Sequence, residues 1–160
     1  LTGSGPTATN ITASPLLFGT DDSYNAGATY PVLRPSSGTN YSYETTIRAS
    51  ASGTFTSLSA WKFYTDGGNG LGTGVGLSVK AIAQGSYAQA TGTQGQTASA
   101  MSGGSDAFGY SSGSPLSLTG SISSAGVGSV QYVRAQASVA STAALGTSSS
   151  EMLTVQWDES

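Results

Sequence analysis

The sequence predicts an all-β fold, either an antiparallel β-sandwich or a jelly roll of about seven to eight short strands. Three observations predict it. Apolar and polar residues alternate in several segments, which is typical of strands with one buried and one solvated face. Glycine-rich segments separate these runs in a chain of 160 residues that holds 23 glycines. No segment combines an apolar period of about 3.6 residues with helix caps.

The clearest alternation runs over residues 41–51. The predicted buried face takes alternate, mostly apolar residues: Tyr41, Tyr43, Thr45, Ile47, Ala49 and Ala51. The residues between them are polar or charged. After Gly53, a second strand over residues 55–64 is richer in large apolar side chains. We therefore predict a hairpin at the edge of an antiparallel sandwich.

Shorter patterns predict the other strands. Residues 10–18 are predicted as an edge strand or a bulge, because Pro15 has no N–H to donate to a ladder. Residues 66–70 are a turn by composition, and the glycines that follow favour a loop over a strand with one bare face. The remaining predicted strands are residues 77–83, a short one near Tyr87, 115–122, 127–140 and 151–158.

The expected organisation is an extended N-terminal arm over residues 1–9 followed by a single β-sandwich domain over residues 10–160. Residues 19–38 form a long irregular loop, and loops of more than about 12–15 residues tend to be functional or to wrap a partner. The arm and this loop are the predicted contacts with a partner. The apolar residues predicted to bind it are Leu16, Leu17, Phe18, Tyr30, Val32 and Leu33.

Composition excludes several function classes. The chain has no cysteine and no histidine, so it lacks thiolate chemistry and the commonest general base. A net charge of −3 with five basic residues predicts no nucleic-acid partner and no anionic membrane surface. No apolar run approaches the roughly 18 residues of a spanning helix. Only 8% of the residues are charged, which suits an ordered β protein packed among neighbours.

Two short motifs match catalytic patterns without their chemistry. Residues 109–113 read G-x-S-x-G, but a nucleophile elbow needs a histidine base. Ser59 and Lys62 read S-x-x-K, but they lie in a predicted strand, where residues three apart point to opposite faces. The acidic residues show no recognisable catalytic pairing. We predict that the protein is not an enzyme and has no catalytic residues.

Metal, cofactor and sugar sites are also weighed against simpler explanations. Asp21 with Asp22, or Asp66 with Asn69, offer oxygen ligands for Ca²⁺, but turn formation explains them without a metal. No cofactor or metal is therefore predicted. Four aromatic residues offer a sugar-stacking platform, for instance Trp61 with Tyr64, although packing in the core is the favoured interpretation. These aromatic residues are Trp61, Phe63, Tyr64 and Trp157.

Three patches carry a family resemblance. They are Ser-Leu-Ser-Ala-Trp-Lys-Phe-Tyr at 57–64 before a glycine-rich turn, Asn-Tyr-Ser-Tyr-Glu at 40–44, and Leu-Thr-Val-Gln-Trp-Asp-Glu at 153–159. Together they resemble the auxiliary virion proteins of tailed bacteriophages. Such proteins are small β-sandwiches or jelly rolls that decorate capsids or sit on tails. The resemblance implies no active site.

The leading hypothesis is a structural component of a virus particle, a capsid decoration (cement) protein. It implies a place in the virion, contacts with the major capsid protein or other virion proteins, and a homo-oligomer, for which trimers at local three-fold axes are one arrangement. A tail or baseplate protein is the nearest alternative. An extracellular carbohydrate-binding β-sandwich module, or a surface-layer or filament subunit, would give the same composition.

Overall fold

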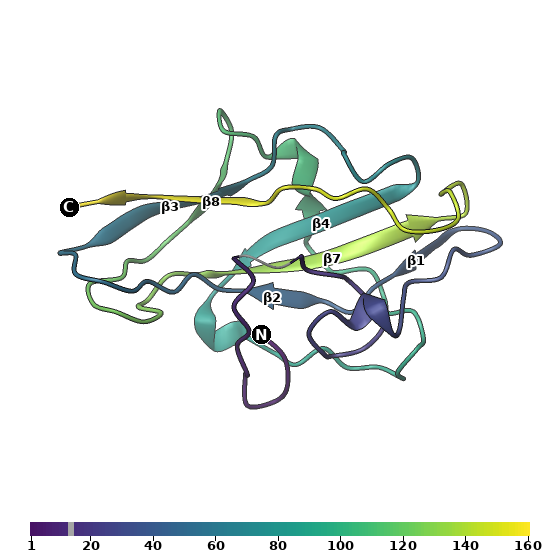
Figure 1. Ribbon diagram of the computed structural model, residues 1–160, viewed down its shortest axis with the longest axis horizontal. Coiled ribbons are helices and arrows are strands. Elements are labelled where there is room, and N and C mark those ends of the chain that lie inside the picture. The colour runs from purple at the N-terminus through teal and green to yellow at the C-terminus, as the bar shows by residue number, and fades with distance from the viewer. Residues whose placement is uncertain (13–14) are drawn as a thin grey trace.

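The computed structural model describes residues 1–12 and 15–160 and confirms the all-β class. The described residues form two antiparallel sheets and three short 3-10 turns (Figure 1). The strands are β1 (Thr39–Tyr41), β2 (Thr45–Ile47), β3 (Leu58–Tyr64), β4 (Val75–Ile82), β5 (Ser105–Asp106), β6 (Leu116–Leu118), β7 (Tyr132–Ala140) and β8 (Thr154–Glu159). The 3-10 turns are η1 (Ala26–Ala28), η2 (Gln84–Ser86) and η3 (Ala107–Gly109).

The larger sheet is built on β7. Its order is β1-β7-β4-β5, and β2 pairs with β7 farther along. The β4–β7 ladder is continuous from Val75 opposite Val139 to Ile82 opposite Tyr132. On its other side β7 is paired twice, with β1 at its C-terminal end and with β2 near its start. This sheet therefore has its longest strand in the middle, as the strong apolar pattern of that strand indicates.

The smaller sheet has the order β6-β3-β8, so β6 and β8 are its edges. The β3–β8 register shifts between Ser59 and Lys62, which marks a β-bulge. Ala60 lies in this bulge with φ of 51°. The extra residue keeps the large side chains on both sides of the bulge pointing inward, since Leu58, Trp61 and Phe63 are all buried.

The main core lies between the two sheets. Side chains from β3 and β6 pack there against side chains from β4 and β7, which is the packing expected of a sandwich. The cluster consists of Leu58, Trp61, Phe63, Leu77, Val79, Ala107, Leu118, Ile122, Val130, Val133 and Ala135. Burial of this apolar surface is the main stabilising contribution to the fold.

The outer face of the larger sheet is covered by other segments of the chain. Gln136 of β7 is 2% exposed, and its Oε1 accepts the Met101 backbone N–H at 2.6 Å. Its Nε2 donates to the carbonyl oxygens of Ser42 and Ser99, each at 2.8 Å. Beside it, Arg134 pairs with Glu44 at 3.1 Å. A polar layer therefore attaches the covering segments to β7. The alternation had predicted a solvated face for Tyr132 and Gln136, which is wrong for both.

The predicted hairpin between residues 41–51 and 55–64 is also wrong. The first stretch divides into β1 and β2, both paired with β7, whereas the second becomes β3 in the other sheet. The break lies at Ser42, whose Oγ accepts the Ala137 N–H at 3.0 Å in place of a backbone carbonyl. Ser42 and Thr46, predicted to be solvated, are 0% and 3% exposed. Alternation indicated strand character here but not the partner strand.

Three further expectations about local structure differ from the outcome. Residues 10–12 and 15–18 contain no strand, and residues 13–14 of that predicted strand lie outside the described residues. Near Tyr87 the chain forms η2 instead of a strand. The extended arm over residues 1–9 is not confirmed, because Thr2 bridges to Thr7 and the Leu1 ammonium donates to the Thr46 carbonyl at 2.6 Å.

Candidate functional site

The first candidate site is the free edge of β8. Within the described residues, β8 pairs with β3 on one side and with no strand on the other. Ser57 and Ser160, just beyond the paired strands, exchange both backbone hydrogen bonds. In an antiparallel ladder such pairs alternate, so the N–H and C=O groups of Val155, Trp157 and Glu159 point to the free edge. This row of backbone groups is a template for pairing with another strand.

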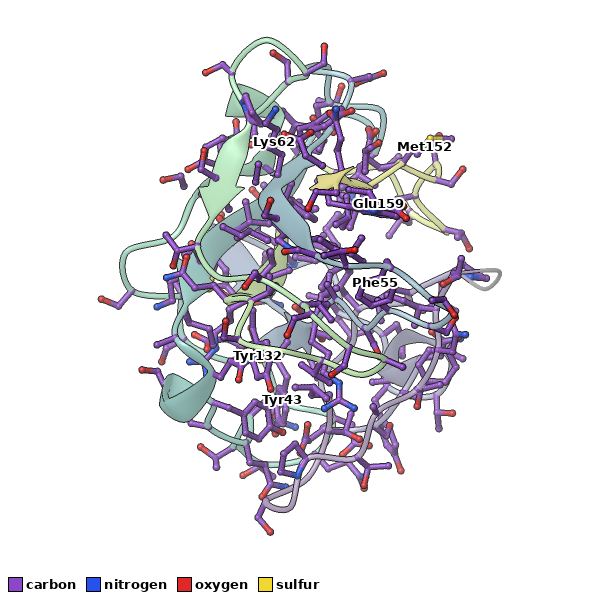
Figure 2. The ribbon with its side chains drawn as sticks, turned by 90° about the vertical axis from the view of Figure 1, so that its left-hand side faces the viewer. Tyr43, Phe55, Lys62, Tyr132, Met152 and Glu159 are labelled. Atoms are coloured by element: carbon purple, nitrogen blue, oxygen red, sulfur yellow. The ribbon has the colours of Figure 1, made fainter. Side chains whose placement is uncertain are left out.

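Exposed apolar side chains accompany this edge. Leu145, Met152 and Trp157 all belong to the C-terminal segment and are 79%, 76% and 45% exposed. Figure 2 shows Met152 and Glu159 in the same part of the molecule. The Trp157 ring packs against the buried Trp61 ring, with 5.2 Å between centroids and 31° between planes. The exposed ring is therefore held in place by the core. We call Thr154–Glu159 with Met152 the β8 edge.

The outer face of the smaller sheet is polar and open. Lys62 lies between the inward residues Trp61 and Phe63, and Ser59 follows the inward Leu58. The bulge thus places Ser59 and Lys62 on the same face, which corrects the prediction that they point to opposite faces. Among the hydrogen bonds of the described residues, none joins the two side chains. An open face without this contact does not have the geometry of a serine–lysine catalytic pair.

The predicted partner-binding residues divide into two groups. Leu33 and Leu17 are exposed, by 66% and 39%, and are accessible to a partner. The other four are half-buried, and one of them, Phe18, packs against the main core. The half-buried group consists of Leu16, Phe18, Tyr30 and Val32. The structure does not bring all six onto one open surface, and their role in binding stays a prediction.

The aromatic residues confirm the favoured interpretation as core packing. Trp61 and Phe63 are 3% and 1% exposed, so they are not accessible to a sugar. Tyr64 lies on the polar outer face and donates to Gln156 Oε1 at 3.3 Å. Trp61 and Tyr64 therefore do not form the exposed platform that a carbohydrate-binding module needs.

Two other candidates are local turns. Asp66 Oδ1 accepts the Gly68 N–H at 2.8 Å, and Asn69 Oδ1 accepts the Leu71 N–H at 3.0 Å. These contacts are those of turn-forming side chains, as the sequence indicated. In the G-x-S-x-G motif, Ser111 and Ser114 exchange backbone hydrogen bonds of 3.3 and 3.0 Å across a tight turn. This is not the strand–turn–helix setting of a nucleophile elbow.

The second candidate site is an acidic pocket of about 270 Å³. Its lining residues are Asp21, Asp22, Tyr43, Gln89, Ala90, Thr91, Gly92 and Gln94. Asp21 Oδ1 accepts from the Gln94 amide at 3.1 Å, and Asp22 Oδ2 accepts the Gly3 N–H at 2.9 Å. A hydrogen bond from Ser23, followed by that from Gln94, lowers the pKa of Asp21 below its usual value. The pocket is therefore anionic at neutral pH.

Tyr43 closes this pocket from below. Its side chain is 5% exposed, and its hydroxyl has no hydrogen-bond partner. Burial, together with the negative charges of Asp21 and Asp22, raises the pKa of Tyr43. Sequence reasoning found Asp21 and Asp22 but assigned Tyr43 only to a strand face. Its alternation pattern contains no signal that the hydroxyl would lie beside the two carboxylates.

A larger cavity, of about 440 Å³, lies between the N-terminal segment and β2. Leu1, Ile11, Leu16, Ile47 and Arg48 are among its lining residues. It includes one predicted partner-binding residue, Leu16. The structure shows no cluster of titratable groups or unpartnered polar atoms in it that would indicate chemistry.

Comparison of the chain with protein-family models, with curated proteins and with solved structures finds no match. In the part of the chain that the structure describes, no helix has the length and apolar character needed to cross a bilayer. The functional argument therefore depends on the chain's own geometry.

Proposed function

We propose that this protein is a non-enzymatic structural component of a virus particle, a decoration protein on the capsid of a tailed phage. The observation that carries the proposal is the β8 edge. An unpaired strand edge beside an exposed, fixed tryptophan is suited to bind an extended segment of a neighbouring protein. In such a complex the backbone supplies the hydrogen bonds, and the side chains supply selectivity.

The composition is consistent with this role. Natural proteins usually block long strand edges with charge, and β8 carries charges only at Asp158 and Glu159. The edge ahead of them is Thr154–Trp157, with no charged residue. A shell presents many equivalent sites, so attachment through a modest contact gains strength from multiple copies. The major capsid protein is the partner that the proposal requires.

A tail or baseplate location would use the same edge and differs only in the particle region that is bound. The carbohydrate-binding alternative loses support because Trp61 is in the core. A surface-layer or filament subunit would bind copies of itself through the edge and assemble without a capsid.

The test uses purified particles that lack this chain, to which purified protein is added. We expect saturable binding with a fixed number of copies per capsid and extra density at head positions in a particle map. Binding only to tails would support the alternative location. Filaments formed by the isolated protein, or no binding to any particle, would contradict the proposal.

A matched pair of variants tests the edge itself. Glu159→Pro removes an edge N–H that makes no ladder bond, and Met152→Asp places a charge beside the edge. We expect the double variant to fold and to bind capsids about tenfold more weakly, since about 1.4 kcal/mol corresponds to that ratio. The control is Lys62→Ala, on the outer face of the same sheet, which should bind normally. Equal binding by the edge variant and the control would exclude the edge as the attachment site.

A further inference from the structure

The acidic pocket contains a polar group that the fold does not satisfy. Nearly all buried polar groups in proteins have a hydrogen-bond partner, and a hydroxyl without one costs about 1–3 kcal/mol. The Tyr43 hydroxyl has no partner although its side chain is 5% exposed. Such an exception needs an explanation, and the charges beside it provide one.

The hydroxyl lies at the wall of the pocket. A Cβ atom built on Gly92 would come within 2.4 Å of the Tyr43 Oη, so the hydroxyl end of the ring is next to Gly92. Gly92 and Tyr43 line the same pocket as Asp21 and Asp22. The absence of a side chain at Gly92 leaves the space between the hydroxyl and the carboxylates open. A ligand in the pocket would lie within reach of all three groups.

The chemistry of the lining favours a hard cation. The pocket presents two carboxylates, two side-chain amides and the Thr91 hydroxyl, and oxygen atoms of these kinds are the ligands of Ca²⁺. No basic side chain lines the pocket, so the two negative charges are not neutralised from within it. Among the described residues, no three acidic side chains gather anywhere. Neutral oxygens and water would therefore complete the coordination.

We propose that this pocket is a low-affinity Ca²⁺ site held by Asp21 and Asp22, in which the Tyr43 hydroxyl gains its missing partner. The ion would connect two segments far apart in the chain, the Asp21–Asp22 loop and residues 89–94. Two hydrogen bonds already connect them: Gln94 to Asp21, and the Gly95 N–H to the Thr20 carbonyl at 2.9 Å. Since these segments help to cover the larger sheet, the site would stabilise that cover.

The site is independent of the β8 edge. In Figure 2, Tyr43 lies toward one end of the molecule, and Lys62, Met152 and Glu159 lie toward the other. Failure of the calcium proposal would leave the capsid proposal untouched, and the reverse also holds.

The first experiment is a thermal melt of the full chain with CaCl₂ after treatment with a chelator. Two-carboxylate sites of extracellular modules have dissociation constants of about 10⁻⁴–10⁻³ M, so millimolar calcium is required. At ten times the dissociation constant we expect the Tm to rise by about 3–5 °C. Mg²⁺ should shift it less, because it gives up its water reluctantly. An equal shift with Mg²⁺, or with NaCl at matched ionic strength, would overturn the proposal.

Variants locate the site. Asp21→Asn with Asp22→Asn should abolish the calcium-induced rise in Tm, whereas Asp158→Asn, a matched removal of charge on β8, should keep it. A shift retained by the double variant would overturn the proposal. Tyr43→Phe should weaken Ca²⁺ binding about fivefold, as expected for one hydrogen bond.

Terbium luminescence provides a second readout that does not depend on stability. Tb³⁺ occupies calcium sites and is sensitised by a nearby tyrosine. We expect emission on excitation of the protein, displacement by Ca²⁺, and a large decrease in Tyr43→Phe even when Tb³⁺ is saturating. Emission that Tyr43→Phe leaves unchanged would show that any bound cation lies elsewhere.

Discussion

The two sheets differ in what covers their outer faces. The larger sheet is buried on both sides, and on its outer face Gln136 of β7 bonds three backbone groups from two covering segments. The smaller sheet is buried on one side only, and Lys62 and Gln156 lie on its open face. The same residue type, glutamine, is thus a buried connector in one sheet and a solvated side chain in the other. A strand's neighbours, rather than its own residues, decide which role a polar side chain takes.

The comparison also separates stability from availability. The covered sheet contains most of the polar bonds that hold the loops in place, so changes there should be costly. The open sheet contains the unpaired β8 edge and the exposed Trp157, so changes there should cost little stability and affect binding. Four substitutions test this difference, from the largest expected effect to the smallest.

The largest effect is expected for Gln136→Leu. It leaves the Met101 N–H and the carbonyls of Ser42 and Ser99 without partners in a buried place. We expect the free energy of unfolding to decrease by about 3 kcal/mol or more, measured by urea denaturation. The matched control is Gln156→Leu on the open face, where the change should stay within about 0.5 kcal/mol. Similar losses in both variants would mean that the two sheets do not differ as described.

Trp157→Ala tests how far the open sheet depends on its exposed ring. The ring loses its contact with Trp61 and part of its buried area, so we expect a loss of about 1–2 kcal/mol in unfolding free energy. Leu145→Ala, at a side chain 79% exposed, is the control and should be nearly neutral. A neutral Trp157→Ala would show that this ring contributes to binding alone.

Ala60→Gly tests the bulge of the open sheet. Ala60 has a φ of 51°, a left-handed conformation in which a Cβ atom is strained by about 1 kcal/mol or more. Its side chain is exposed, so glycine removes the strain without creating a cavity. We expect stability to increase by about 0.5–1 kcal/mol in denaturant titration. Ala28→Gly, also exposed but without a positive φ, should instead lower stability. A decrease in both would disprove the strain.

Tyr43→Phe has the smallest expected effect at neutral pH. In the presence of a chelator it removes an unpartnered hydroxyl, so stability should be unchanged or up to about 1 kcal/mol higher. Because the folded state raises the pKa of Tyr43, its neutral form stabilises the protein below the ordinary tyrosine pKa of about 10. That contribution is lost as pH rises through the folded-state pKa.

Melts between neutral and strongly alkaline pH measure this dependence. The wild type should lose stability more steeply than Tyr43→Phe above about pH 10. Some dependence will remain in the variant, because burial also raises the pKa of Tyr87. Identical alkaline profiles would mean that Tyr43 is not shielded in solution.

Much of the strand content could be predicted from local patterns. Residues 77–83, 127–140 and 151–158 were predicted as strands and contain most of β4, β7 and β8. Where apolar residues alternate, a strand places them on one face, and burying that face is the strongest term that folding offers. The pairing of strands was not predictable in this way, since a strand over residues 41–47 can pair equally well with any strand of suitable length.

The candidate sites show the same division. The carboxylates of Asp21 and Asp22 are adjacent in the chain, so their chemistry could be proposed from residue types. Tyr43 and Gly92 reach them only because loops from two distant parts of the chain close over β7. The edge position of β8 likewise depends on what fails to pair with it.

The amino-acid order by itself determined that this chain is all-β, which segments extend, and that histidine and cysteine chemistry are absent. The tertiary structure decided which strands are neighbours, which polar residues are buried, and where a hydroxyl meets two carboxylates. The physical reason is range: side-chain alternation and turn formation act over a few residues. Burial and hydrogen-bond satisfaction depend on whatever part of the chain arrives from far away.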